Sequence, residues 1–314
     1  MKYLRLFFLT ILLISCSNKG TVQGEKPLRL VFITTCVDED FFKPVKRGMT
    51  DAATLMGVEC TFTGTPGADA QAQAQMVLLA LEQGVDGIAL NIIDSLIFDD
   101  VVGLALSKGV PVVAFNGDDD KTPNPRLAAV SQNHLRGGRL FGEKIAESIP
   151  ANSHVLATMH SAGIAALDDR LHGIREVLEP KGITFHVVVT SNIADKASVV
   201  IADALKVNPS IKAVLCTGLS DTEGAAMAIE KYFSDRNLIA AGFDLSPHIA
   251  RYIRNGQLAF TIDQQPYMQG FYPVVQLTHY LRYGIMPCDN SIGAAFVTRN
   301  NVDQVEALIA KEFR

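Results

Sequence analysis

Polar side chains follow two short apolar strands in the segment 239–266. Asp244 comes directly after the first expected strand, and Gln264 comes shortly after the second, which is expected over Leu258–Ile262. In open α/β sheets, ligands bind at the carboxyl ends of the strands. Two polar side chains at such an edge are suited to binding a ligand. The segment therefore predicts a ligand-binding site at this edge of the sheet.

The elements that must position these side chains alternate between apolar strand patterns and helical patterns along the chain. Strands that are apolar on both faces and separated by helices indicate parallel sheets covered on both sides. The first such set predicts strands over 28–34, 58–62, 87–90 and 110–115, and helices over 41–56, 70–82 and 96–107. The pattern restarts after a polar break, with a helix expected over 134–149 and a strand over 155–159. A helix, a strand and a helix are expected from there through Lys206, followed by strands over 213–216 and 238–241.

Two sets of βα units in 314 residues predict two doubly wound α/β domains. We expect the chain to cross between them near residues 130–132, near 262–264 and near 291–294. The predicted lobes are accordingly 27–131 with 265–291, and 132–264 with 292–314.

The first residues form a targeting segment. Lys2 and Arg5 supply a positive start, and the apolar run Leu6–Leu13 is too short to span a bilayer. We expect residues 1–15 to be a signal peptide and residues 16–26 to be a flexible tether. An ordinary signal peptide with an incidental Cys16 is the alternative to the lipoprotein described below.

Composition and charge exclude several function classes. The net charge of −5 becomes more negative once the segment carrying Lys2 and Arg5 is removed, which argues against a nucleic-acid partner. The chain contains no G-x-S-x-G, G-x-x-x-x-G-K-[ST], G-x-G-x-x-G or H-E-x-x-H motif, so we expect no enzyme and no cofactor. Trp is absent, and any aromatic stacking must come from Phe or Tyr.

The cysteines beyond Cys16 show no zinc-binding spacing, and we predict no metal site. Cys36 and Cys60 fall on or near adjacent expected strands, so a disulfide between them is an open alternative. The favoured interpretation is that these two thiols are free and buried.

The run 239–266, with GFD after one strand and DQQP after the next, closely resembles the ribose- and galactose-binding proteins of bacterial transport systems. The resemblance extends over nearly all of the chain after the tether. It implies a type 1 periplasmic binding fold, with two lobes joined by a three-segment hinge that close on a carbohydrate. It also implies an ABC transporter permease as partner, and we expect a monomer outside the cytoplasm. Leu13-Ile14-Ser15-Cys16 resembles the lipobox of bacterial lipoproteins, which implies a lipid on Cys16 and anchoring to a membrane.

The resemblance implies binding residues in the first lobe. Phe41 and Phe42 match a pair that stacks on the sugar, and Glu39 stands where Asn is common. Asn91 matches a strand-end Asn that bonds a hydroxyl. Asn116 departs from the pattern, because ribose-type proteins carry Asp-Arg there. This departure favours a ligand larger than ribose or differently substituted. Core packing for the two rings and a turn for Asn91 are the alternatives.

The second lobe contributes the remaining implied contacts. Arg170 matches the Arg-x-x-Gly of the family, where its planar fork can bond two adjacent hydroxyls. Ser220, or Asp221 beside it, stands near a family Asn-Asp pair. Asp244 and Gln264 complete the set. A salt bridge for Arg170, a helix cap for Asp244 and a hinge hydrogen bond for Gln264 are the structural alternatives.

Proteins with this fold also present bound ligands to membrane sensors or chemoreceptors, and that role is the alternative to transport. A transcription regulator of the lac-repressor type shares the two-lobed core but carries an N-terminal helix-turn-helix. Here a signal peptide and a tether are expected in that place, which excludes a regulator.

Overall fold

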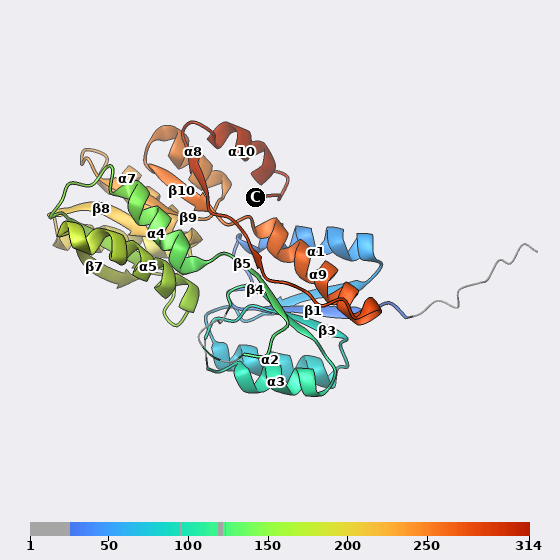
Figure 1. Ribbon diagram of the computed structural model, residues 1–314. Helices are drawn as coiled ribbons and strands as arrows, with labels where there is room; N and C mark the ends of the chain where they lie inside the picture. The colour runs from blue at the N-terminus through green and yellow to red at the C-terminus, as the bar shows by residue number, and fades with distance from the viewer. Residues whose placement is uncertain (1–25, 95, 119–121, 123) are drawn as a thin grey trace, which may run out of the picture.

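The protein folds into two α/β units, each built around a six-stranded sheet (Figure 1). The structure is a computed structural model that describes residues 26–94, 96–118, 122 and 124–314. The predicted signal peptide, most of the tether and Cys16 lie outside the described residues. Among the described residues, no helix is both long enough and apolar enough to cross a membrane.

The first sheet is parallel throughout, with strand order β11-β5-β4-β3-β1-β2. Its strands are β1 (Arg29–Thr34), β2 (Glu59–Gly64), β3 (Gly87–Leu90), β4 (Val112–Asn116), β5 (Ala128–Ser131) and β11 (Asn290–Ser291). Helices α2 (Ala70–Glu82) and α3 (Asp99–Ser107) cover one face of this sheet, and helices α1 (Phe42–Met56) and α9 (Pro266–Tyr283) cover the other (Figure 1). The central strands β1, β3 and β4 are buried almost throughout, as continuous apolar runs predict.

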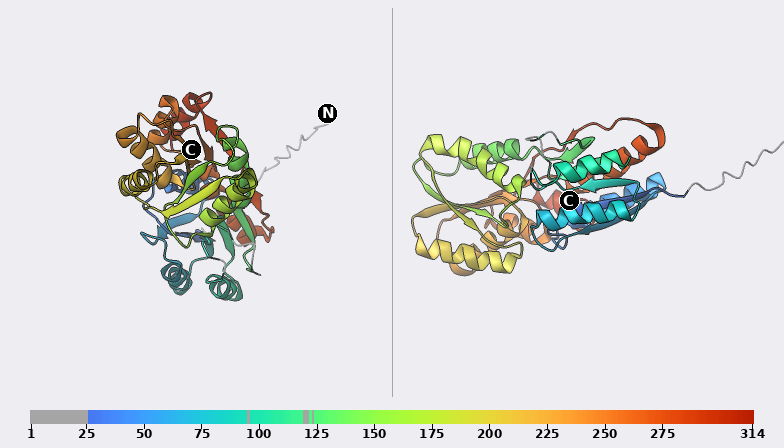
Figure 2. Two further views of the ribbon diagram at one scale, coloured as in Figure 1. Left: turned by 90° about the vertical axis from the view of Figure 1, so that its left-hand side faces the viewer. Right: turned by 90° about the horizontal axis from the view of Figure 1, so that it is seen from below.

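The second sheet has the order β12-β10-β9-β8-β6-β7, and only β12 runs antiparallel to its neighbour. Its strands are β6 (His154–Met159), β7 (Thr184–Val189), β8 (Ile211–Cys216), β9 (Ile239–Phe243), β10 (Phe260–Asp263) and β12 (Ala295–Thr298). Its helices are α4 (His134–Ile145), α5 (Ala165–Leu178), the short 3-10 turn Glu179–Lys181, α6 (Ala194–Val207), α7 (Leu219–Tyr232), α8 (Pro247–Asn255) and α10 (Val302–Ile309). Helices α4 and α5 pack together on one face, and α6 and α7 pack together on the other (Figure 2).

The chain passes between the two sheets three times, after β5, after β10 and after β11. These crossings confirm the predicted fold class of two doubly wound sheets with a three-segment connection. The exact lobe boundaries remain a prediction. Strand β5, strand β11 and the antiparallel strand β12 were not predicted, and the predicted helix over 134–149 ends at Ile145.

Glycines let helices α1 and α9 approach each other closely on the first sheet. A Cβ atom added at Gly48 would lie 2.0 Å from the carbonyl oxygen of Tyr267, and one added at Gly270 would lie 1.9 Å from that of Val45. Neither clash can be relieved by rotating a side chain, because both partners are backbone atoms. The contact fixes the N-terminus of α9, which follows Gln264, beside the helix that follows Phe41.

The cysteine expectations are met in part. Cys36, Cys60, Cys216 and Cys288 are all free among the described residues. Cys60 lies in β2 opposite Leu30, near the start of β1, whereas Cys36 lies beyond the end of β1 at Thr34. The two thiols are therefore separated along the strands and form no disulfide. Cys36 is buried as predicted and Cys60 is half-buried, while Cys216 is buried and Cys288 is exposed on the loop before β11.

Candidate functional site

A cavity of about 50 Å³ lies between the two units, at the carboxyl ends of their parallel strands. We call it the central cavity. Its lining residues are Thr35, Cys36, Glu39, Phe41, Phe42, Asn91, Asn116, His160, Ile164, Ala166, Leu167, Arg170, Asp244 and Gln264. Strands β1, β3 and β4 deliver the residues of the first unit, while β6, α5, β9 and β10 deliver those of the second. Every predicted binding residue except Ser220 therefore lies at one place.

The apolar wall of the cavity is the pair of rings at the start of α1. Phe41 and Phe42 meet edge to face with ring centroids 5.1 Å apart. Phe42 also packs against Phe62, with centroids 5.6 Å apart, so it belongs to the core of the first unit as well as to the cavity. This agrees with both interpretations of the pair: packing fixes the rings, and their remaining surface faces the cavity.

Asn91 is held within the first unit, and Asn116 contacts the second unit, before any ligand arrives. The Asn91 amide nitrogen donates to Thr34 Oγ1 at 2.9 Å, and its Oδ1 accepts from the backbone N–H of Gly117 at 2.8 Å. Asn116 has a left-handed backbone with φ of 60°, and its carbonyl oxygen lies 2.9 Å from Nε2 of the buried His134. Each Asn keeps further hydrogen-bonding capacity on its side chain, because an amide offers two donors and two lone pairs.

Arg170 is buried at the opposite wall, on α5. Its Nη1 donates to the carbonyl oxygen of Thr217 at 2.8 Å, and its Nη2 lies 3.4 Å from Oε1 of Gln132, which stands at the first crossing. The guanidinium also lies over the Phe243 ring, 4.3 Å from its centroid. Its Nε has no hydrogen-bond partner among the described residues. The side chain is thus anchored by the fold with one buried donor unused.

Asp244 and Gln264 form a hydrogen-bonded chain across the edge of the second sheet. Gln264 Nε2 donates to Asp244 Oδ1 at 2.5 Å, and Gln269 Nε2 donates to Gln264 Oε1 at 3.1 Å. Asp244 has a left-handed backbone with φ of 72°, a conformation that is uncommon for non-glycine residues and clusters at functional sites. Burial raises the pKa of Asp244, while the nearby Arg170 charge acts to lower it.

Glu39 reaches the cavity from the loop after β1. Its side chain is only 9% exposed, and its Oε1 is buried without a hydrogen-bond partner. Burial, with the charge of Asp244 added, raises the pKa of Glu39 to about 8. An isolated buried carboxylate is costly, so the proton remains on this carboxyl group until an outside partner supplies donors or positive charge.

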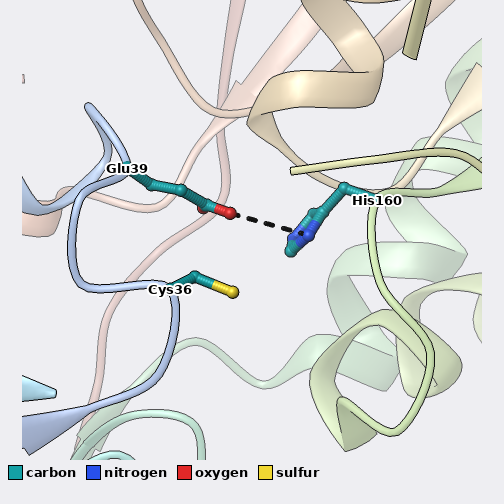
Figure 3. Close-up of side chains that lie close together, drawn as sticks. All are labelled: Cys36, Glu39 and His160. Carbon is teal, nitrogen blue, oxygen red and sulfur yellow. Dashed lines mark ion pairs between the residues drawn. The ribbon is translucent and has the colours of Figure 1, made fainter. Parts of the chain in front are cut away.

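His160 and Cys36 complete the polar wall around Glu39 (Figure 3). Nδ1 of His160 lies 3.7 Å from Oε1 of Glu39. Burial, with the Arg170 charge added, lowers the pKa of His160 to about 4, so near neutral pH this contact joins two uncharged groups and is not an ion pair. Burial raises the pKa of the Cys36 thiol to about 12.

Ser220 and Asp221 serve the fold rather than the cavity. Ser220 Oγ donates to the carbonyl oxygen of Asn192 at 3.1 Å. Asp221 accepts from Thr158 Oγ1 at 2.7 Å and from the backbone N–H groups of Thr217 and Gly218 at 2.9 and 3.0 Å. It therefore caps the start of α7. Neither residue lines the central cavity.

Some lining residues were not predicted, namely Thr35, Cys36, His160, Ile164, Ala166 and Leu167. A signal for two of them was present, because Thr35 directly follows β1 and His160 directly follows β6, just as Asp244 directly follows β9. The same strand-end rule applied to every strand would have found both.

Comparison with known proteins identifies the family. The family model described as "Periplasmic binding protein domain" matches residues 30–284. The chain belongs to the periplasmic binding protein family. Its relatives are solute-binding proteins, which agrees with the expectation that the chain is not an enzyme, and the family implies a place outside the cytoplasm.

Two curated relatives illustrate the similarity. The xylose/arabinose-binding protein XylF of Sulfolobus acidocaldarius is 30% identical over 298 residues, covering 90% of this chain and 74% of the relative. The ribose import binding protein RbsB of Bacillus subtilis is 26% identical over 258 residues, covering 81% of each.

Solved structures share the fold. A carbohydrate transporter from Acidothermus cellulolyticus 11B, in complex with myo-inositol, superimposes with a TM-score of 0.82 at 26% identity, covering 92% of this chain and all of the other. The XylFII-LytSN complex superimposes with a TM-score of 0.82 at 20% identity, covering 88% of this chain and 99% of that one, a likeness of fold alone.

Proposed function

We propose that this protein is the solute-binding component of a carbohydrate ABC transporter and captures one sugar or polyol per chain in the central cavity. The cavity offers aromatic rings for the C–H faces of such a ligand and polar groups for its hydroxyls. The names of its relatives support this class of ligand: pentoses for XylF, ribose for RbsB and myo-inositol for the Acidothermus protein.

One observation carries the proposal. Arg170 Nε, a donor in the second unit, and Glu39 Oε1, an acceptor in the first, are both buried without a partner. Leaving a buried polar atom unpaired costs about 1–3 kcal/mol. Both atoms belong to residues that line the same cavity. A ligand that both accepts and donates, as hydroxyl groups do, would satisfy the two walls at once.

The charge of the cavity narrows the ligand class. Arg170 is the one guanidinium among the lining residues, and the nearby Asp244 carboxyl group offsets its charge, so the cavity offers an anion no uncompensated positive charge. Anionic ligands such as sugar phosphates or sugar acids are disfavoured in such a setting. A neutral or weakly cationic sugar is the proposed ligand.

The proposed mechanism is closure of two lobes, 27–131 with 265–291 and 132–264 with 292–314, around the sugar. A ligand that contacts both walls favours the closed arrangement by its differential affinity for that state. The closed surface would be recognised by a transport permease; a sensor that reads the same surface would be the alternative partner. We further propose that the protein is a monomer held at the membrane by a lipid on Cys16. Release of a Cys16→Ser variant from the membrane fraction would test the anchor.

The test of ligand class is a thermal-shift screen of the purified protein against monosaccharides, polyols and short oligosaccharides. A ligand that binds only the native state raises the melting temperature. We expect neutral sugars or polyols to raise it, followed by calorimetric titration with a dissociation constant near micromolar, about −8 kcal/mol. Tight, preferential binding of a sugar phosphate would contradict the charge argument, and the absence of any carbohydrate hit would contradict the function.

A further inference from the structure

We propose that Cys36, Glu39 and His160 form a binding site for a thiophilic divalent cation, Zn²⁺ above all, inside the central cavity. The cluster unites a thiol, a carboxyl group and an imidazole, which are the three kinds of side chain that bind zinc in proteins. Their ligand atoms all lie within 4.8 Å of one another. Figure 3 shows Cys36 and Glu39 on one side and His160 on the other, with the side chains of Glu39 and His160 pointing toward each other.

The spacing of the donor atoms is close to that of a coordinated ion. With metal–ligand bonds of about 2.0–2.3 Å, neighbouring donors in a tetrahedral site lie roughly 3.3–3.8 Å apart. Oε1 of Glu39 and Nδ1 of His160 are already 3.7 Å apart. Cys36 belongs to the same short loop as Glu39, so a small adjustment of its thiol would complete three protein ligands. The fourth position would remain open to water or another ligand, as in sites that exchange their ligands.

Two further observations point to a ligand at this cluster. Oε1 of Glu39 is buried with no hydrogen-bond partner, although a carboxyl oxygen facing another titratable group is expensive to leave unpaired. Cys36 has a left-handed backbone with φ of 52°, which is uncommon for a residue with a side chain. Both features lie on the loop after β1. A bound cation would satisfy the oxygen and would give the strained residue a role.

The charge balance of the site suits a dication. A thiolate, a carboxylate and a neutral imidazole together carry the charge that Zn²⁺ neutralises, and the protons of the thiol and the carboxyl group pass to the buffer. The other charged groups near the cluster are Arg170, which opposes a cation, and Asp244 and, outside the cavity lining, Asp221, which favour it. The surrounding field is therefore acidic on balance.

The site would couple metal binding to closure, because its ligands come from both units. Cys36 and Glu39 follow β1 of the first sheet, and His160 follows β6 of the second. A bound ion would hold the two lobes together in the closed arrangement. The same three residues line the sugar cavity, so metal and sugar would compete; this competition rests on the proposed function, but the metal site itself does not.

The experiment is a titration of chelator-treated, purified full-length protein with Co²⁺ and then Zn²⁺, without sugar. Cobalt bound to a thiolate gives a near-ultraviolet charge-transfer absorption, which reports that a thiol of the chain has become a ligand; the variants then assign that thiol. We expect one equivalent per chain and displacement of Co²⁺ by Zn²⁺. Cys36→Ser should abolish the absorption, and His160→Gln and Glu39→Gln should each weaken Zn²⁺ binding by about a hundredfold or more. Cys288→Ser removes the exposed thiol and should change nothing.

Absorption that survives Cys36→Ser or disappears in Cys288→Ser would overturn the proposal, as would the absence of stoichiometric Zn²⁺ binding to the unaltered protein. Stoichiometric Zn²⁺ binding by the unaltered protein needs no variant, so the proposal can be overturned even if a variant folds poorly. Sugar affinity measured separately, in the presence of chelator, distinguishes the proposed metal site from the proposed transport function. Sugar binding without zinc binding would remove only the metal site, and zinc binding without sugar binding would remove only the transport function.

Discussion

At the scale of the residue, the central cavity contains some polar groups that the fold already satisfies and others that it does not. Asn91 is engaged by Thr34 and Gly117, and Arg170 has two of its three nitrogens bonded. Glu39 presents a bare oxygen. The sequence could place these residues at strand ends, but it could not tell a satisfied group from an unsatisfied one, because the partners come from distant segments.

Variants of Asp244 and Asp221 should distinguish an aspartate that binds ligand from one that stabilises the fold. Asp244→Asn keeps an oxygen for Gln264 but loses the charge offered to the ligand. Charge-assisted hydrogen bonds contribute about 1.5–3 kcal/mol, so we expect sugar affinity to fall by roughly ten- to a hundredfold. The melting temperature of the unliganded protein should stay the same or rise, since burial disfavours the charged form. Calorimetric titration beside thermal melting measures both.

Asp221→Ala is the control variant for Asp244→Asn, and it should affect stability rather than sugar binding. It removes three hydrogen bonds at the start of α7 without touching the cavity. Unfolding free energy should fall by about 2–4 kcal/mol, while sugar affinity measured well below the melting temperature should change by less than about threefold. The reverse pattern in the two variants would show that the roles have been exchanged.

Glu39 should make stability depend on pH. Its pKa is raised from an ordinary 4.5 to about 8, so between these values the folded protein holds a proton that the unfolded chain has released. The unaltered protein should therefore lose stability, relative to Glu39→Gln, as pH rises from 5 to 8. The expected difference is about 1–3 kcal/mol. Denaturant unfolding at pH 5, 6.5 and 8, without ligand, measures it; parallel curves for the two proteins would contradict the burial of this carboxyl group.

At the scale of the element, the sequence predicts strands and helices where the pattern is long and apolar. Strands β1, β3 and β6 and helix α2 lie where periodicity places them. Strand β11 has two residues and β12 is antiparallel at a sheet edge, so neither has the buried run that marks a central strand. The cluster of Cys36, Glu39 and His160 escaped prediction for a related reason. Its members lie on different sheets, so their spacing along the chain has no meaning until the fold brings them together.

The contact between α1 and α9 should be intolerant of a single methyl group. Gly48→Ala places a Cβ atom against backbone and should cost about 2–4 kcal/mol of unfolding free energy. Gly103→Ala in α3 is the matched control, because a Cβ atom there meets nothing within 4 Å and alanine favours the helix by about 0.5–1 kcal/mol. Urea unfolding of both variants should give shifts of opposite sign. A tolerated Gly48→Ala would mean that the two helices lie farther apart.

At the scale of the whole molecule, the two units touch through more than the cavity. Asn192, on the loop before α6, donates to the carbonyl oxygen of Pro66 in the first unit at 3.2 Å. Phe313 near the C-terminus packs on Tyr267 of α9 with ring centroids 4.9 Å apart. The Asn192 contact joins the two units, so closure would make or break it. Such contacts set the population of the closed arrangement without touching the ligand.

Asn192→Ala should therefore weaken sugar binding although its side chain does not line the cavity. Apparent affinity scales with the fraction of protein in the binding-competent state, and an exposed hydrogen bond contributes about 0.5–1 kcal/mol. We expect a two- to fivefold loss of affinity, carried by faster dissociation because closed complexes reopen more readily. Stopped-flow kinetics and calorimetric titration measure the two quantities. Asn300→Ala, at an exposed turn of the second unit, is the control and should leave both unchanged. If Asn192→Ala slows association and leaves dissociation untouched, the contact acts before closure, and the closed state must be held by the ligand alone.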